Sequence, residues 1–271
     1  MVYKEISEIA PIRQGDVIVS NGDGGVCTYG LIITADCDIA REKHKNHFTW
    51  VELVSVYEYI SSIWAFEEVA KRKDKPIKVL LEYVNGKLKG QGYAEVSAKR
   101  LVDWIVEVGV ELFVDRVLGG VCPPDIRNKM EAVHIACSND PLSAIDRLRL
   151  FCDKTQVDFS GVLDRAKKDL TGGDGGFPDF FFLPKLPGAL SGGAVALLRN
   201  IYSIQNQEIY VSESQARISN QSKCFYRVCR LEDRVKYSIT QKIAFLFSRI
   251  GMSPEFECLA SEAASLAIEF K

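Results

Sequence analysis

The pattern of hydrophobic and polar positions changes along the chain, and residues 11 to 58 have the pattern of β-strands. Valine, isoleucine, threonine and aromatic residues occur there in short runs, separated by turn-forming stretches such as NGDGG. These runs predict strands in PIRQGDVIVS, YGLIITAD and FTWVELVSVY. We therefore expect this part of the chain to contribute to a sheet.

Residues 60 to 170 follow a helical period instead. The segment RLVDWIVEVGVELFVDRVL has apolar residues at helical spacing, and NDPLSAIDRLRLFCDK begins with Asn139 or Asp140 as a cap and Pro141 near the first turn. The stretch VLLEYVNGKLKGQGY interrupts this region, because the pair Asn85–Gly86 is typical of a tight β-hairpin. The region is predicted to be mainly helical.

The chain returns to a β pattern after the glycine-rich break TGGDGGFPD. Strands are predicted in FFFLPKLPG and GAVALLRNIYSI, and QARISNQSKCFYRVCRL is a candidate extension of them. The segment VKYSITQKIAFLFSRIG predicts a helix that ends at Gly251, and Ser253 with Pro254 predicts the start of a final helix.

Together these segments predict an α+β fold. Its β-core would be formed by residues 1–58 and 178–271, and residues 59–177 would be a mainly helical insertion. A protein of two separate domains is the alternative interpretation.

Composition narrows the class of protein. Hydrophobic residues make up 47% and charged residues 26%, which is typical of a globular protein. The formal net charge of −2 gives no global attraction to nucleic acid or membrane, although a local basic groove stays open. The first residues lack the pattern of a signal peptide, and no apolar run approaches the ~18 residues that span a bilayer. We therefore expect a cytoplasmic protein without a membrane partner, with its eight scattered cysteines reduced.

Two aspartates follow the second predicted strand and are the first candidate site. Alternation along a strand places Asp36 and Asp38 on one face, where two carboxylates could hold a divalent metal. His44 and His47 lie three residues apart and could share a helical face beside Lys43, a further candidate catalytic residue. The alternative is that Asp36 or Asp38 caps a helix beginning near Ile39 and balances the charge of Lys43.

Three known site patterns match these residues to different extents. The D-x-D pattern of haloacid dehalogenases fits LIITADCD, and GDGGFPD resembles the later acidic loop of that family. The D-x-D of nucleotide-sugar transferases fits the strand but has no supporting nucleotide-binding half. A restriction-type nuclease core needs a later E-x-K or D-x-K on a strand, and none follows.

Three short segments resemble the MazF/PemK-like toxin barrel. They are Gly15-Asp16-Val17, the strand Leu31 to Thr34, and LLRNIYSI at 197–204 followed by a final helix. The resemblance implies a small SH3-like barrel and metal-independent cleavage of single-stranded RNA, with Thr34 at the place of a family hydroxyl. Where the family has Arg-Pro, this chain has Tyr29-Gly30, so the arginine that stabilises phosphate charge has no counterpart there.

Basic residues near the last predicted strand are the second candidate site. Interleaved with aromatic residues, they could line a groove that binds a nucleic-acid backbone. These residues are Lys223, Arg227, Arg230 and Arg234. The alternative is a solvated strand face.

Three functions remain open from the sequence. The first is a component of a bacterial toxin or anti-phage defence system that acts on or near RNA or DNA. The second is a non-catalytic subunit of such a system that binds a protein partner encoded nearby. The third is a metal-dependent hydrolase that uses Asp36 and Asp38. An enzyme would thus be ribonuclease-like or a metal-dependent hydrolase, and we expect no cofactor except a divalent metal in the third case.

Overall fold

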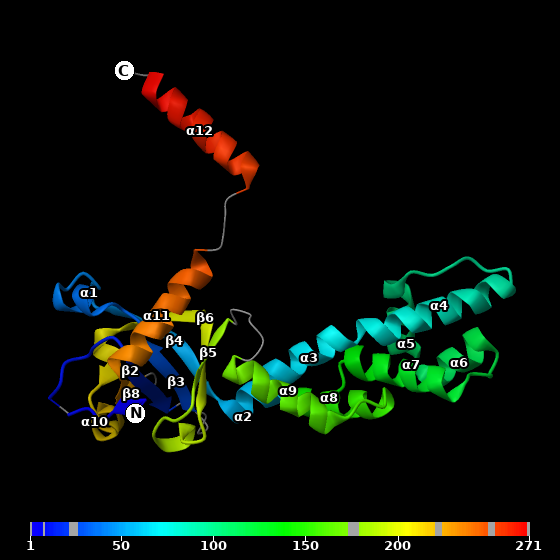
Figure 1. Ribbon diagram of the computed structural model, residues 1–271, viewed down its shortest axis with the longest axis horizontal. Coiled ribbons are helices and arrows are strands. Elements are labelled where there is room, and N and C mark those ends of the chain that lie inside the picture. Colours follow the sequence, from blue (N-terminus) through cyan, green and yellow to red (C-terminus); the bar gives the residue numbers. More distant parts are fainter. Residues whose placement is uncertain are drawn as a thin grey trace. The chain divides into compact units, whose positions relative to one another are not determined.

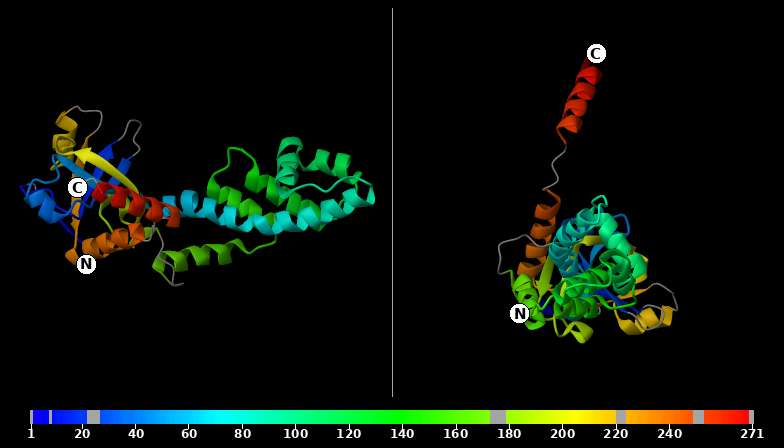
Figure 2. Two further views of the ribbon diagram at one scale, coloured as in Figure 1. Left: turned by 90° about the horizontal axis from the view of Figure 1, so that it is seen from above. Right: turned by 90° about the vertical axis from the view of Figure 1, so that its right-hand side faces the viewer.

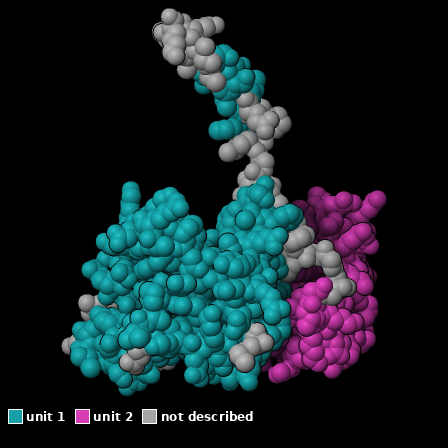
Figure 3. All heavy atoms as spheres, turned by 60° about the vertical axis from the view of Figure 1, so that its left-hand side comes forward, with its two compact units in different colours: residues 1–54, 177–271 teal, residues 55–176 magenta. Residues whose placement is uncertain are grey.

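The computed structural model describes residues 2–7, 9–21, 27–172, 179–219, 224–248 and 253–269. The chain forms two compact units (Figure 3). Unit 1 comprises residues 1–54 and 177–271, and unit 2 comprises residues 55–176.

Unit 1 is built on one curled sheet (Figure 1). Its described strands lie in the order β1-β8-β2-β3-β4-β6-β5, with β7 paired to β8. Most neighbouring strands pair antiparallel, whereas β7 pairs parallel with β8. The strands are β1 (Tyr3–Lys4), β2 (Asp16–Asn21), β3 (Cys27–Ile32), β4 (His47–Ser55), β5 (Phe180–Leu183), β6 (Ala194–Gln205), β7 (Ile209–Tyr210) and β8 (Phe225–Leu231).

This sheet confirms that the three segments expected in one β-core lie together. Asp16 opens β2, Leu31 lies near the end of β3, and residues 197–204 belong to β6. The protein is accordingly of mixed α and β structure, with a half-barrel of mainly antiparallel strands.

Both faces of the sheet bury apolar side chains, which explains the dense β patterning of these segments. One face carries Val17, Leu31 and Leu231 and packs against Ile239 and Leu246. The latter two come from α11 (Asp233–Phe247). The other face carries a second cluster, formed by Ile18, Ile32, Phe48, Trp50, Ile204 and Ile209.

The predicted strand from Leu31 to Asp38 is wrong beyond Ile32. The backbone N–H groups of Ile33 and Thr34 both donate to the Thr49 carbonyl, at 2.9 and 3.3 Å, so the alternating ladder stops there. A short helix, α1 (Asp36–Ala40), follows. Thr34, Asp36 and Asp38 therefore do not share a strand face.

The candidate extension at 215–231 is only partly a strand. Its first residues belong to α10 (Glu213–Ser219), and β8 begins at Phe225. Short helical turns occur at Gly188–Leu190 and Asn206–Glu208. The final helix is α12 (Pro254–Glu269), which begins at the proline as expected.

The elements described in unit 2 are helices, and α7 packs against both α4 and α8 (Figures 1 and 2). The unit opens with α2 (Val56–Glu58) and a π-helical turn (Tyr59–Trp64). Its other helices are α3 (Ala65–Arg72), α4 (Asp74–Gly90), α5 (Ala98–Val108), α6 (Val110–Leu118), α7 (Pro124–Cys137), α8 (Ala144–Lys154) and α9 (Phe159–Thr171). Leu80, Leu101, Phe113 and Met130 are among the fully buried members of its core.

The hairpin predicted at Asn85–Gly86 is wrong, because α4 runs through both residues. Leu80, Val84 and Leu88 recur every four residues on the buried side of this helix, and their burial outweighs the local turn preference. The Asn85 side chain instead binds both backbone groups of Val96, at 2.9 and 3.1 Å.

The predicted cap of α8 is also corrected. Ser143, not Asn139 or Asp140, caps the helix, because its Oγ accepts a hydrogen bond from the N–H of Asp146. The single helix expected over residues 100–118 is two helices, separated at Gly109, where φ is 77°.

All eight cysteines are free in the structure. Within the described parts of the chain, no helix has both the length and the apolar character needed to cross a bilayer.

Two glycines in contrasting environments test this fold. A Cβ at Gly30 on β3 would lie 2.4 Å from the ring of Trp50, whereas a Cβ at Gly86 on α4 meets nothing within 4 Å. We expect Gly30→Ala to lower the free energy of unfolding by about 1–3 kcal/mol through overpacking. Gly86→Ala should raise it by about 0.5–1 kcal/mol, because alanine favours the helix. Urea unfolding of both variants checks this, and equal effects of the two substitutions would contradict the packing at Gly30.

Candidate functional site

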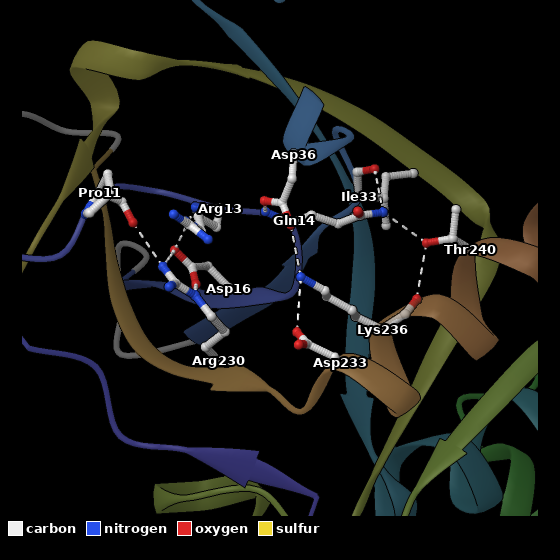
Figure 4. A network of polar contacts seen from close by, with 10 residues as sticks. All are labelled: Pro11, Arg13, Gln14, Asp16, Ile33, Asp36, Arg230, Asp233, Lys236 and Thr240. Carbon is white, nitrogen blue, oxygen red and sulfur yellow. Dashed lines mark hydrogen bonds and ion pairs between the residues drawn. The ribbon is translucent and has the colours of Figure 1, made fainter. Parts of the chain in front are cut away.

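A network of polar contacts lies at one end of the strands in unit 1, where β3 and β8 end and β2 begins (Figure 4). It joins three segments that are far apart in the sequence: residues 11–16, 33–36 and 230–240. Asp16 of the motif Gly15-Asp16-Val17 and Asp36 of the first candidate site both belong to this network.

Asp16 is the most deeply buried charge of this network, with none of its side chain exposed. Arg230 donates to both of its oxygens, from Nε at 2.5 Å and from Nη2 at 3.1 Å, and Nη2 also binds the Pro11 carbonyl. The backbone N–H of Arg13 donates to Oδ2 as well. This bidentate geometry is the strong form of a carboxylate–guanidinium pair, and it explains why an aspartate opens β2.

Arg227 lies on the same strand as Arg230 but entirely inside the unit, with 1% of its side chain exposed. Its Nη1 is 3.5 Å from Oδ2 of Asp16, and its three guanidinium nitrogens have no hydrogen-bond partner among the described residues. A buried donor without an acceptor is costly, so Asp16 stabilises this cation mainly through charge. In this arrangement Arg227 and Arg230 face Asp16, not a solvent-exposed groove.

Asp36 is engaged through both carboxylate oxygens. Oδ1 accepts the backbone N–H of Gln14 at 3.0 Å, and Oδ2 accepts Lys236 Nζ at 2.8 Å. The residue that precedes α1, Ala35, provides no side-chain cap, and Asp36 does not act as one. The capping interpretation is therefore replaced by a pairing with a lysine 200 positions further along the chain.

Lys236 connects α11 to the start of β2. Its side chain is 5% exposed and also binds Asp233, at 3.1 Å. Burial by itself lowers the pKa of Lys236, but hydrogen bonds to Asp36 and Asp233 outweigh it and raise that pKa. Gln14 is also buried, and its Nε2 donates to the Thr240 hydroxyl at 2.9 Å. Thr240 lies one turn after Lys236, so Gln14 provides a second contact to α11.

The other predicted catalytic residues are dispersed. Thr34 bridges β3 and β4, because its hydroxyl accepts the Thr49 N–H at 2.7 Å. The Asp38 carboxylate lies 3.7 Å from Cys37 Sγ, and Lys43 is exposed. Asp38 thus does not join Asp36 in the network.

The two histidines do not share a helical face, because residues 41–46 form turns. The ring of His44 stacks on Phe48 with centroids 4.8 Å apart, and His47 lies 3.5 Å from the hydroxyl of Ser203. Their contacts therefore diverge.

The remaining members of the predicted sites are placed as follows. Arg234 is exposed on α11. Lys223 and Asp174 of the acidic loop lie outside the described residues, and Asp179 pairs with Arg199. Across the ranges that the structure describes, no three histidine, cysteine or acidic side chains gather in a group that could hold a metal ion.

Sequence reasoning missed Gln14 and Lys236. The one signal for Lys236 is its position beside Val235 and three before Ile239, within the apolar pattern of α11. A lysine inside such a pattern predicts a buried counter-charge, because an unpaired cation is costly there.

In comparisons with known proteins, no family model, no curated protein and no solved structure matches this chain. The resemblance to the MazF/PemK-like barrel therefore stays a prediction.

The two aspartates give a matched test of the candidate metal site. We expect Asp36→Asn to lower the free energy of unfolding by about 1–3 kcal/mol, because it weakens the partner of a buried lysine. Asp38→Asn should change it by less than about 0.5 kcal/mol, since that carboxylate has no charged partner among the described residues. Urea unfolding and calorimetry with Mg²⁺ and Mn²⁺ check both. Metal binding that is lost in Asp36→Asn without a change in stability would establish the metal site instead.

Cys229 gives a pH-dependent test of the Asp16 environment. Burial, and then the charge of Asp16, raises the pKa of this thiol to about 12. Unfolded cysteine ionises near pH 8.5, so between roughly pH 9 and 12 the unfolded state gains stability and unfolding becomes easier, by up to about 1.4 kcal/mol per pH unit. Cys229→Ala should remove this component of the slope, and Cys37→Ala at an exposed site should keep it. An unchanged slope in Cys229→Ala would contradict this environment.

Proposed function

We propose that this protein is a non-catalytic, partner-binding protein, and that its context is the bacterial toxin or anti-phage system that the family resemblance implies. The observation that carries the proposal is an apolar stripe on α12. Phe256, Leu259, Ala260 and Ala263 occupy positions i, i+3, i+4 and i+7 of this helix, and all are exposed.

The stripe is not a scatter of single apolar residues. Phe256 is 53% exposed and Leu259 is 64% exposed, and the spacing places both on one side of the helix. Glu255 and Glu262 add charge elsewhere on the helix surface, and the Ser253 hydroxyl accepts the N–H of Phe256 at its start. A capped amphipathic helix of this kind fits the binding mode in which an apolar helix face enters a hydrophobic groove of a partner protein.

Two features of the polar network weigh against catalysis as the main role. The carboxylate of Asp36 is occupied by Gln14 and Lys236, so a metal would have to displace both. Arg230 is bound to the buried Asp16, which reduces the charge available to a nucleic-acid backbone. Binding of a protein partner is therefore the function that the described residues support best.

The proposal is tested by coexpression with the products of adjacent genes. We expect one of them to form a stable complex with the wild-type chain, and Phe256→Ser or Leu259→Ser to weaken that complex by at least about tenfold, because apolar anchors dominate such interfaces. Calorimetry on the purified complex measures the change.

Glu262→Gln is the matched control, because it lies on the same helix and removes charge without changing the stripe. It should keep the wild-type affinity within about threefold. The proposal fails if no neighbouring gene product binds, or if the complex is indifferent to both substitutions in the stripe. RNA cleavage by the isolated wild-type chain would favour the ribonuclease-like alternative.

A further inference from the structure

A cavity of ≈ 570 Å³ lies within unit 2, between the α3–α4 junction, α7 and the segment from α8 to α9. This volume is in the range of small-molecule sites. Basic side chains dominate its charged lining, against the carboxylates of Glu68 and Asp125. The basic residues are Lys71, Arg72, Lys75, Lys129, Lys154 and Arg165.

The ion pairs within the lining do not neutralise all of its positive charge. Arg72 and Arg165 share the single carboxylate of Glu68, at 2.7 and 3.6 Å. Lys129 pairs with Asp125 at 3.4 Å. Glu68 is 5% exposed and therefore fixes the two arginines from inside the unit.

The remaining lysines either pair with carboxylates outside the lining or form no ion pair among the described residues. Lys71 and Lys154 reach carboxylates that do not line the cavity, those of Glu67 at 3.8 Å and Glu131 at 2.5 Å. Lys75 makes no ion pair with any described residue. The cavity therefore presents a cationic wall that a ligand anion would complement.

Arg72 adds a fixed positive charge to this wall. Its Nε donates to Oε1 of Glu68 at 2.7 Å, which holds the guanidinium in place. Its Nη2 lies 2.7 Å from the same oxygen in an ion pair and is itself buried. Arg72 therefore acts on a ligand through its charge, and direct contact falls to the lysines, of which Lys75 is exposed.

The rest of the lining suits an organic ligand more than a bare ion. Pro76, Val79, Phe151 and Val157 contribute apolar surface. Asn128 and Gln156 add amide groups that can both donate and accept hydrogen bonds. A ligand with a charged end and a larger uncharged part would use both kinds of surface.

We propose that this cavity binds an organic phosphate of nucleotide size. Its phosphate oxygens would lie against the lysines, within the positive field of Arg72 and Arg165, because guanidinium and ammonium groups are the usual partners of phosphate. The uncharged part would contact the apolar surface beside Val79. This site is separate in the chain from α12 and does not depend on the partner-binding proposal.

Calorimetry on the full chain tests the site with ATP, AMP, adenosine and inorganic phosphate as probes. We expect ATP or AMP to bind and adenosine and inorganic phosphate to bind at least about tenfold more weakly, since neither uses both kinds of surface. Affinity should fall as salt is added, because charge drives the contact.

Two lysines of α4 provide the matched variants. Lys75→Glu reverses an exposed charge in the lining, and Lys78→Glu makes the same change at an exposed position outside it. We expect about tenfold or greater loss of affinity for the first and less than about twofold for the second, with both melting temperatures unchanged. Absence of binding at millimolar nucleotide, or equal losses in both variants, would overturn the proposal.

Discussion

A carboxylate without access to solvent must be matched by positive charge, and Asp16 imposes this condition on unit 1. Its side chain is fully buried at the start of β2, and Arg227 and Arg230 of β8 supply the compensation. Removing either side of such an arrangement leaves an unpaired charge in a low-dielectric interior, which is more harmful than never having had the pair. The register between β2 and β8 is therefore specified by electrostatics as well as by apolar burial, since Asp16 lies opposite Arg230.

A second ion pair lies at the same end of these strands, and its two sides differ in exposure. Lys236 is buried but its partners are more accessible, with 31% of Asp36 and 64% of Asp233 exposed. Gly15 lies between the two pairs with φ of 90°, and a Cβ there would come within 3.1 Å of the Lys236 side chain. A left-handed backbone and the close approach of a lysine stem both require glycine at this position. The Gly-Asp pair thus serves two neighbouring ion pairs at once.

Local patterns in the sequence predicted most elements but not the roles of the charged residues. Strands β2, β4 and β6 follow from runs of β-branched residues, because those runs are buried wherever the sheet is covered. The predicted hairpin at Asn85–Gly86 does not form, because the burial of Leu80, Val84 and Leu88 along α4 outweighs the local turn preference of this pair. The position of Asp36 after a predicted strand marks it as a candidate site residue. Its partners Gln14 and Lys236 are 22 and 200 positions away, and no short-range pattern encodes such pairing.

The distance between the partners in sequence has a consequence for the order in which the chain folds on the ribosome. Asp16 and Arg230 are separated by 214 positions, so at roughly 5–20 residues per second the aspartate waits about 10–40 s for its arginine. During that time β2 and β3 can pair with each other, but the Asp16 carboxylate at the free edge of β2 stays solvated. Residues 55–176 have their core contacts within themselves and complete their synthesis earlier. The nascent sheet of unit 1 thus exposes the edge of β2 that pairs with β8 until late in synthesis, and an exposed strand edge can pair with other chains.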